Sequence, residues 1–365
     1  MIISQCDFGK ACLLAFVVFK PIVHSDKSKQ GRINTSRPAD PTLTGQNNNN
    51  LNSAAPSPTR TRDLATVGHI QRDIGLLPQD CGHLSLYKME QTTASIPIIN
   101  ISPSNPNAPQ ELLSAASTYG FIFIENDAQT GIPPSEIANI FTLSKRFFAA
   151  PLAEKQTVAI ASNKAGKNLG WLSRGIEKLD PETQKRADVK EAFNIGPPSS
   201  HTGTLDDQPL PPTLQPHSQA ITTFQTRCHA LCQLLLFHLA NALQIPDDWF
   251  TSRHDQTLGP SGTVFRMLYY PALPENENET QNGGEDLRAG AHSDFGSLTL
   301  LFQLPGQPGL EIQTPSGAWA SVPVDPSRGE SEMEMEEERE EGSTGAPSKP
   351  LPILVNIGDL LEDVS

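Results

Sequence analysis

The pattern of apolar and polar residues divides the folded part of the chain into a first half with helical periodicity and a second half of short β-rich runs. Alternation predicts strands in "SIPIINIS" (95–102) and "FIFIEN" (121–126), with a helix in "PQELLSAASTYG" (109–120) between them. Two more amphipathic helices are predicted, one over 134–151 with Ser135 as its N-cap and a long one over 217–243. From residue 261 onward, Gly and Pro separate apolar runs that are typical of short strands.

These elements predict an α+β fold. A helical region over 95–250 is followed by a β core over 261–365, and strands that succeed one another directly favour an antiparallel sandwich or barrel over a parallel sheet.

Residues 1–88 lack this periodicity over most of their length. The part from Ser25 to Arg62 is rich in Asn, Ser, Thr and Pro and cannot bury enough apolar surface to offset its ordering entropy. The apolar run Ala11–Phe19 is similar to the core of a signal peptide, but no clear small-residue cleavage site follows it, and it is too short to span a bilayer. We expect residues 1–88 to be a disordered extension, or a segment joined wrongly in the gene model.

The distribution of charge and the cysteines indicate which partners and which cellular compartment to expect. Half of the net charge of −14 lies in Glu330–Glu341, which holds eight Glu and one Arg, so residues 327–350 are predicted to be an acidic low-complexity insertion in the β core. Without a basic stripe we expect no nucleic-acid partner, and without targeting signals a cytoplasmic protein is the default. The five cysteines favour a reducing compartment, and Cys228 and Cys232 fall on an apolar helix stripe typical of core packing.

The stretch "GAHSDFGSLTLLFQ" (290–303) places a histidine and an aspartate two residues apart at the start of a predicted strand. In extended backbone these positions point to the same side, so His292 and Asp294 would aim an imidazole and a carboxylate at one point. They are two of the three ligands of a 2-His-1-carboxylate Fe(II) site. The same spacing also arises by chance, with the histidine at a strand end and the aspartate in a turn.

Several motifs surround this pair in a fixed order: "FRMLYYP" (265–271) before it, and "GLEIQTPSGAWASVPVD" (309–325) and "ILVNIGDLLE" (353–362) after it. Together with "SIPIINIS", "YGFIFIEN" (119–126) and "KEAFNIG" (190–196), they resemble the Fe(II)- and 2-oxoglutarate-dependent oxygenases of the isopenicillin N synthase-like class. The resemblance extends from about residue 95 to the C-terminus. It implies a distorted jelly-roll (double-stranded β-helix) core with an iron at one open end.

The resemblance also implies roles for individual residues. His292 and Asp294 would ligate the iron, and Tyr270 would contact the carboxylate of the co-substrate. Arg266 lies on the same strand face as Tyr270 by alternation, and we expect it to form an ion pair.

Asn356 and Asp359 of "NIGD" are expected to shape a turn rather than bind metal.

The chain departs from the family at the third ligand. His292 is the last of its nine histidines, whereas relatives carry a further histidine, and the arginine that pairs with 2-oxoglutarate, on strands after "NIGD". We therefore expect the core to be truncated at its C-terminus. Two weaker alternatives are an upstream histidine, among His229, His238 and His254, or a downstream carboxylate, Glu362 or Asp363.

The expected family activity is oxidation of a small organic molecule by hydroxylation, desaturation or cyclisation, with Fe(II), 2-oxoglutarate and O₂. We expect a monomer without a membrane partner. We also expect this truncated chain to be inactive, because the distal histidine and the co-substrate arginine are absent from it. Two alternatives stay open. One is a non-catalytic binding relative or a gene-model fragment, and the other is an iron oxidase that works without 2-oxoglutarate.

Overall fold

The computed structural model describes residues 2–3, 12–20, 92–129, 131–160, 168–177, 188–205, 208–272, 290–327 and 350–362. The predicted extension from residue 21 to 88 and the acidic residues 328–349 lie outside the described residues. All of these described residues belong to one compact unit.

The centre of this unit is an eight-stranded sheet with the order β3-β4-β11-β8-β2-β7-β6-β5. Neighbouring strands run antiparallel, except that β3 and β4 are parallel. The strands are β2 (Cys12–Phe19), β3 (Ile98–Ile99), β4 (Phe121–Ile124), β5 (Gly170–Leu172), β6 (Glu191–Ile195), β7 (Val264–Tyr270), β8 (Leu298–Gln303) and β11 (Ile353–Ile357). A second sheet has the order β1-β9-β10, formed by Ile2–Ile3, Leu310–Gln313 and Trp319–Ser321.

The predicted helices are present with small shifts at their ends. They are α1 (Ala108–Tyr119), α2 (Pro134–Phe148) and α4 (Ser218–Ala242). The structure also has the short helices α3 (Leu152–Thr157) and α7 (Asp359–Glu362), which were not predicted, and 3₁₀ helices over Gln215–His217 and Thr251–His254. The N-cap prediction for α2 is wrong: the cap is Pro133, because the prolines at 133 and 134 begin the helix before Ser135. The region predicted to be helical also contributes strands β3 to β6. These strands form one sheet with the strands of the predicted β core.

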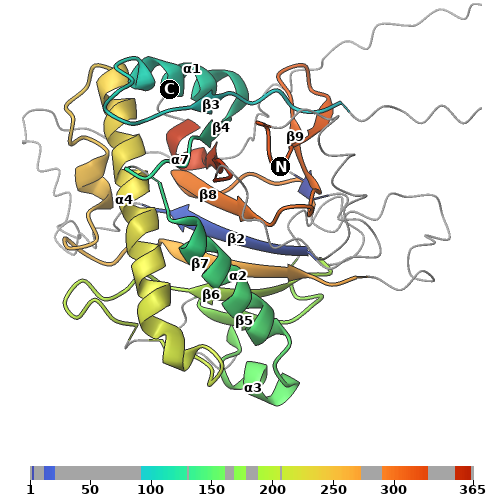
Figure 1. Ribbon diagram of the computed structural model, residues 1–365. Coiled ribbons are helices and arrows are strands. Elements are labelled where there is room, and N and C mark those ends of the chain that lie inside the picture. The colour runs from blue at the N-terminus through green and yellow to red at the C-terminus, as the bar shows by residue number, and fades with distance from the viewer. Residues whose placement is uncertain are drawn as a thin grey trace, which may run out of the picture. The chain divides into compact units, whose positions relative to one another are not determined.

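Strand β2 corrects the expectation that residues 1–88 lie wholly outside the folded domain. The apolar run at 12–19 is neither a free leader nor an edge strand. It lies between β7 and β8, paired with β7 from Cys12 to Val18 and with β8 from Leu14 to Phe19. Figure 1 shows it as the blue strand between two orange ones. An apolar run without polar alternation is what a strand covered on both faces requires.

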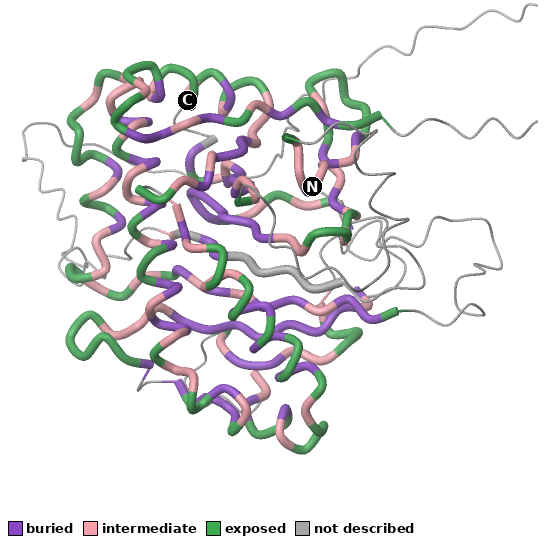
Figure 2. Tube along the Cα trace, in the orientation of Figure 1, coloured by how far each residue is buried: buried purple, intermediate pink, exposed green. Residues whose placement is uncertain are grey.

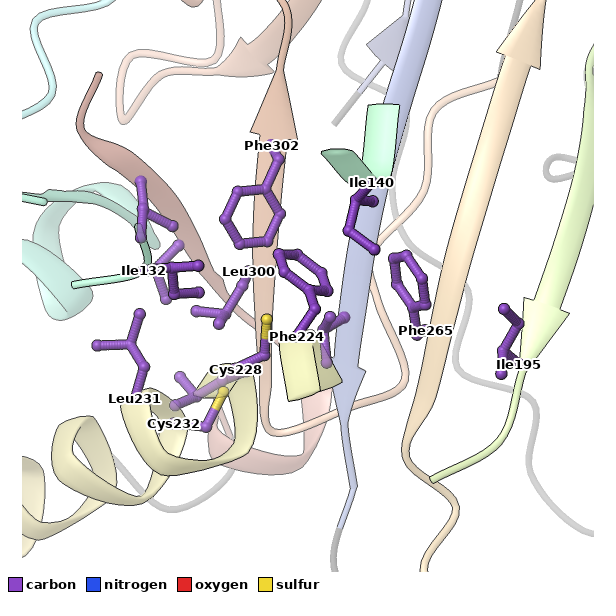
Figure 3. Packing of buried hydrophobic residues seen from close by; sticks show 14 of the residues in the cluster. Ile132, Ile140, Ile195, Phe224, Cys228, Leu231, Cys232, Phe265, Leu300 and Phe302 are labelled. Carbon is purple, nitrogen blue, oxygen red and sulfur yellow. The ribbon is translucent and has the colours of Figure 1, made fainter. Parts of the chain in front are cut away.

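The helices cover one face of the large sheet. Side chains of α4, including Phe224 and Cys228, point toward Phe302 of β8 in Figure 3, and the rings of Phe224 and Phe302 are 5.3 Å apart. Phe224 also contacts the ring of Phe265 on β7, at 5.4 Å. Cys228 and Cys232 are fully buried free thiols, which confirms the prediction of core packing.

The second sheet covers the opposite face. Strand residues that alternate with the helix-facing ones, such as Phe123, Leu268 and Leu354, form a separate cluster with Leu310 and Ile312 of β9. In Figure 2 the strands of the large sheet that are coloured by burial are largely buried, whereas the outward sides of the helices are exposed. We call the face toward β9 and β10 the interior face. The residues of the candidate site lie along it.

The position of β2 can be tested with Val17, which is 2% exposed in the helix-side core. Val17→Asp should lower the free energy of unfolding by about 3 kcal/mol or more, because a carboxylate would be buried without a partner. Urea denaturation measures this. Leu258→Asp at a 60% exposed position is the control and should change stability little. Equal midpoints for Val17→Asp and the wild type would show that residues 12–19 do not pack in the sheet.

Candidate metal centre

His292 and Asp294 lie on the segment that leads into β8. Both are partly buried, while the residues beside them, Ser293 and Phe295, are exposed, the latter at 78%. The segment is irregular rather than a regular strand. Burial nevertheless alternates along it from Ser293 to Phe295, with the period expected of extended backbone.

The imidazole of His292 is fixed in one tautomer. Its Nδ1 lies 2.8 Å from the carbonyl oxygen of Gly290, which can only accept, so Nδ1 carries the proton and donates it. Nε2 then keeps its lone pair, as a metal ligand must. Burial lowers the pKa of His292 below its usual value, partly offset by the bond to Gly290 and the charge of Asp294, so the neutral form that ligates a metal is favoured.

The carboxylate of Asp294 is held by two donors on neighbouring strands. Thr299 Oγ1 donates to Asp294 Oδ2 at 2.7 Å, and Asn356 Nδ2 donates to the same oxygen at 3.0 Å. Thr299 on β8 and Asn356 on β11 are direct register partners, which is why both reach one oxygen. No described residue bonds Oδ1. The role in a turn that the sequence predicts for Asn356 does not include this hydrogen bond to Asp294.

Backbone bonds fix the same segment. Asp359 N donates to Asp294 O at 2.9 Å, and Gly358 N donates to Ser297 O at 3.0 Å. The approach is so close that a Cβ on Gly358 would lie 2.2 Å from Gly296 O. Only glycine fits at this position.

The donor set fits a divalent metal through two protein ligands, His292 Nε2 and Asp294 Oδ1, which are a neutral imidazole nitrogen and a carboxylate oxygen. A further observation, on Asn356, supports the fit. Asn356 Oδ1 is buried, and no described residue donates to it, as expected if a donor such as a water on the metal belongs there. Within the described ranges, no group of three His, Cys, Asp or Glu side chains could hold a metal.

The alternative third ligands are not brought to this pair by any described contact. His254 Nδ1 donates to Phe250 O at 2.8 Å, so its Nε2, 2.8 Å away, accepts from Ser297 Oγ, and both ring nitrogens are engaged. His229 Nε2 lies 3.3 Å from the side-chain amide of Gln233 on the same helix.

The structure describes neither the side chain of Glu362 nor Asp363. The carboxylate alternative therefore stays a prediction.

Tyr270 and Arg266 both lie on the interior face of β7, as predicted from alternation. Tyr270 is only 1% exposed and packs in the core cluster of that face. Arg266 forms the expected ion pair: its Nη2 lies 2.8 Å from Glu177 Oε1, and its Nε donates to Asn194 Oδ1 at 3.0 Å.

A charge cluster that the sequence reasoning missed surrounds this ion pair. Lys190 Nζ lies 2.5 Å from Asp188 Oδ2 and 3.2 Å from Glu177 Oε2, and the Lys190 side chain is 3% exposed. Burial raises the pKa of Glu177, but Arg266 and Lys190 lower it more, so the net shift is downward. The signal in the sequence was "DVKE" (188–191), in which Asp188 and Lys190 share one side of extended backbone.

Comparison with known proteins identifies the family. The model of the "non-haem dioxygenase in morphine synthesis N-terminal" region matches residues 96–218, and the 2OG-Fe(II) oxygenase superfamily model matches residues 261–331. The UPF0676 protein C1494.01 of Schizosaccharomyces pombe is 34% identical over 238 residues, which are 63% of this chain and 68% of that protein. The chain belongs to the 2OG-Fe(II) oxygenase superfamily.

Two further similarities agree with this membership. Proline hydroxylase buaE of Petromyces alliaceus is 31% identical over 62% of this chain and 68% of that protein. The crystal structure of a full-length Neurospora crassa protein in complex with alpha-KG and thymine superposes with a TM-score of 0.55 at 26% identity, covering 73% of this chain and 74% of that one. The predicted family and its use of Fe(II), 2-oxoglutarate and O₂ are confirmed.

The charge cluster gives a pH-dependent prediction. Glu177→Gln should lower the free energy of unfolding by about 1–2 kcal/mol at pH 7, because Lys190 and Arg266 lose a partly buried anion. The folded pKa of Glu177 is depressed, so its stabilisation is present above the unfolded pKa and is lost as pH falls through the folded pKa.

Urea denaturation from pH 7 to pH 3 measures the difference, which should shrink toward the acid end. The exposed Asp247→Asn is the matched control and should behave like the wild type. A difference that stayed constant over this range would contradict the assigned pairing.

Proposed function

We propose that this protein is an Fe(II)- and 2-oxoglutarate-dependent oxygenase that hydroxylates, desaturates or cyclises a small organic molecule. The observation that carries the proposal is the preorganised pair His292 and Asp294. The bond from Nδ1 to Gly290 fixes the His292 tautomer whose Nε2 carries a lone pair toward a metal, and two donors hold one Asp294 oxygen so that the other can ligate. A partly buried imidazole and carboxylate that are oriented by hydrogen bonds are typical of functional sites.

In this proposal the core, residues 261–365 with strands from the preceding region, is a distorted jelly roll. His292 Nε2 and Asp294 Oδ1 hold the metal, and Tyr270 on the interior face contacts the carboxylate of 2-oxoglutarate. Fe(II) bound there would supply oxidation by O₂ coupled to the conversion of 2-oxoglutarate to succinate and CO₂. The protein residues fix ligand orientation and keep the interior face dry, which confines oxidation to a substrate held beside the site.

The proposed substrate class is a small polar molecule. One relative is named a proline hydroxylase, and the Neurospora crassa structure holds thymine. The interior face of this chain carries Lys190, Arg266 and Asn194 next to apolar residues, which suits a molecule with polar groups to orient it. Among the helices of the described chain, none is long and apolar enough to cross a membrane.

The ligand assignment can be tested by succinate formation. His292→Ala and Asp294→Ala should each reduce Fe(II)-dependent conversion of 2-oxoglutarate to succinate at least about 100-fold, because each removes a metal ligand. His201→Ala, at an exposed position, is the control and should keep wild-type turnover. Succinate is measured by NMR after anaerobic loading with Fe(II) and exposure to O₂.

Other outcomes would favour the alternatives. Metal binding by the wild type without succinate or oxidised product would favour a non-catalytic relative. Fe(II)-dependent consumption of O₂ that is unaffected by 2-oxoglutarate would favour an oxidase. Equal turnover by His292→Ala and the wild type would overturn the ligand assignment.

A further inference from the structure

We infer that Thr299 and Asn356 are positioning residues for the metal: they hold one oxygen of Asp294 so that the other is presented to the ion. The inference rests on the proposed function, because it concerns the same site. It assigns a role to two side chains that neither bind the metal in the proposal nor belong to the H-x-D motif.

The first argument is chemical. A free carboxylate rotates about its terminal bond and presents either oxygen to a cation. In this structure two donors from different strands converge on Oδ2, at 2.7 Å from Thr299 Oγ1 and 3.0 Å from Asn356 Nδ2. Both lone-pair directions of Oδ2 are thereby used. Rotation that brought Oδ2 to the metal would break both bonds.

The second argument is burial. Thr299 is 0% exposed and Asn356 is 4% exposed, so water cannot readily replace either donor. The two residues are also register partners in the β8–β11 pair, which fixes their spacing through the sheet rather than through a loop. Ligand-supporting hydrogen bonds from rigid, buried positions are those whose loss reduces metal affinity most.

The third argument is the second atom of the same amide. Asn356 Nδ2 is committed to Asp294, which leaves Asn356 Oδ1 buried with no donor from any described residue. A buried acceptor without a partner costs free energy, and a ligand group that donated to it would recover part of that cost. Asn356 thus holds the proposed aspartate ligand with its Nδ2 and leaves its Oδ1 available to accept from a group bound beside that aspartate.

The fourth argument is the way β11 ends. Directly after Asn356, the backbone at Gly358 and Asp359 bonds to Ser297 O and Asp294 O. The Asn356 side chain and this backbone therefore hold the Asp294 segment from the same strand end. A displacement of β11 would move the carboxylate and its segment together.

The test uses Co(II) alone as the probe, titrated into full-length protein and followed by calorimetry and by its visible absorption spectrum. Thr299→Val keeps the side-chain shape and removes the donor, and it should weaken Co(II) affinity about 10–100-fold. Thr299→Ser keeps the hydroxyl and should restore affinity to within a few fold of the wild type. Asn356→Leu should also weaken binding and change the Co(II) spectrum, because the ligand oxygen is no longer fixed.

Thr222→Val on α4 is the matched control. Like Thr299→Val, it removes a buried hydroxyl, which here donates to Gln219 O at 3.0 Å. Because Thr222 lies on α4, far from Asp294 in the sequence, the substitution should leave Co(II) affinity unchanged. Urea denaturation of each variant reports folding separately. A variant that unfolds is replaced by its partner, since Thr299 and Asn356 test the same oxygen independently.

The outcomes separate this inference from the proposed function. If folded Thr299→Val and Asn356→Leu bind Co(II) with the affinity and spectrum of the wild type, the positioning role is overturned. The proposed metal site is then unaffected. Loss of affinity in Thr299→Ser as severe as in Thr299→Val would also overturn it, because the hydroxyl would not be the cause. Folded wild-type protein that binds no Co(II) would overturn the proposed function, and this inference with it.

Discussion

The fold depends on the pairing of strand β2 with its two neighbours, β7 and β8. Each of these two neighbours presents a row of backbone N–H and C=O groups toward the other, and these groups are costly to bury without hydrogen bonds. Strand β2 lies between them and pairs with both. Its outer end is tied as well, because Lys20 N donates to Thr263 Oγ1 at 3.1 Å. Residues near the start of the chain thus complete the middle of the sheet.

This pairing also positions the candidate site. Tyr270 and Arg266 belong to β7 on one side of β2, whereas Thr299 and the Asp294 segment belong to β8 on the other side. Two strand spacings of about 4.8 Å therefore separate the two groups of side chains along the interior face. The helix layer packs against the opposite face, where the ring of Phe224 contacts Phe265 on β7 and Phe302 on β8.

Around Asp294, polar groups are satisfied by partners from several parts of the chain. Thr299 is near in sequence, but Asn356 is 62 residues away, and His254 reaches Ser297 from 43 residues upstream. The result is a carboxylate with one restrained oxygen beside an imidazole of defined tautomer. Preorganisation of this kind lowers the cost of binding a cation, because the ligand atoms lose little freedom when the ion binds.

The sequence by itself predicted the elements whose signal is local. The periodicity of α4 and the alternation in β7 each depend on neighbouring residues, and both elements are present as expected. The family resemblance followed from the order of such local motifs.

The tertiary structure alone decided which distant segments meet. No local pattern reveals that residues 12–19 fill a gap between β7 and β8, that Asn356 reaches Asp294, or that Glu177 bridges Arg266 and Lys190. Each of these contacts satisfies a buried hydrogen bond or charge created elsewhere in the chain. A backbone or side-chain polar group needs such a partner only once the sheet has buried it. The partner can lie anywhere in the chain, so the contact leaves no periodicity in the sequence.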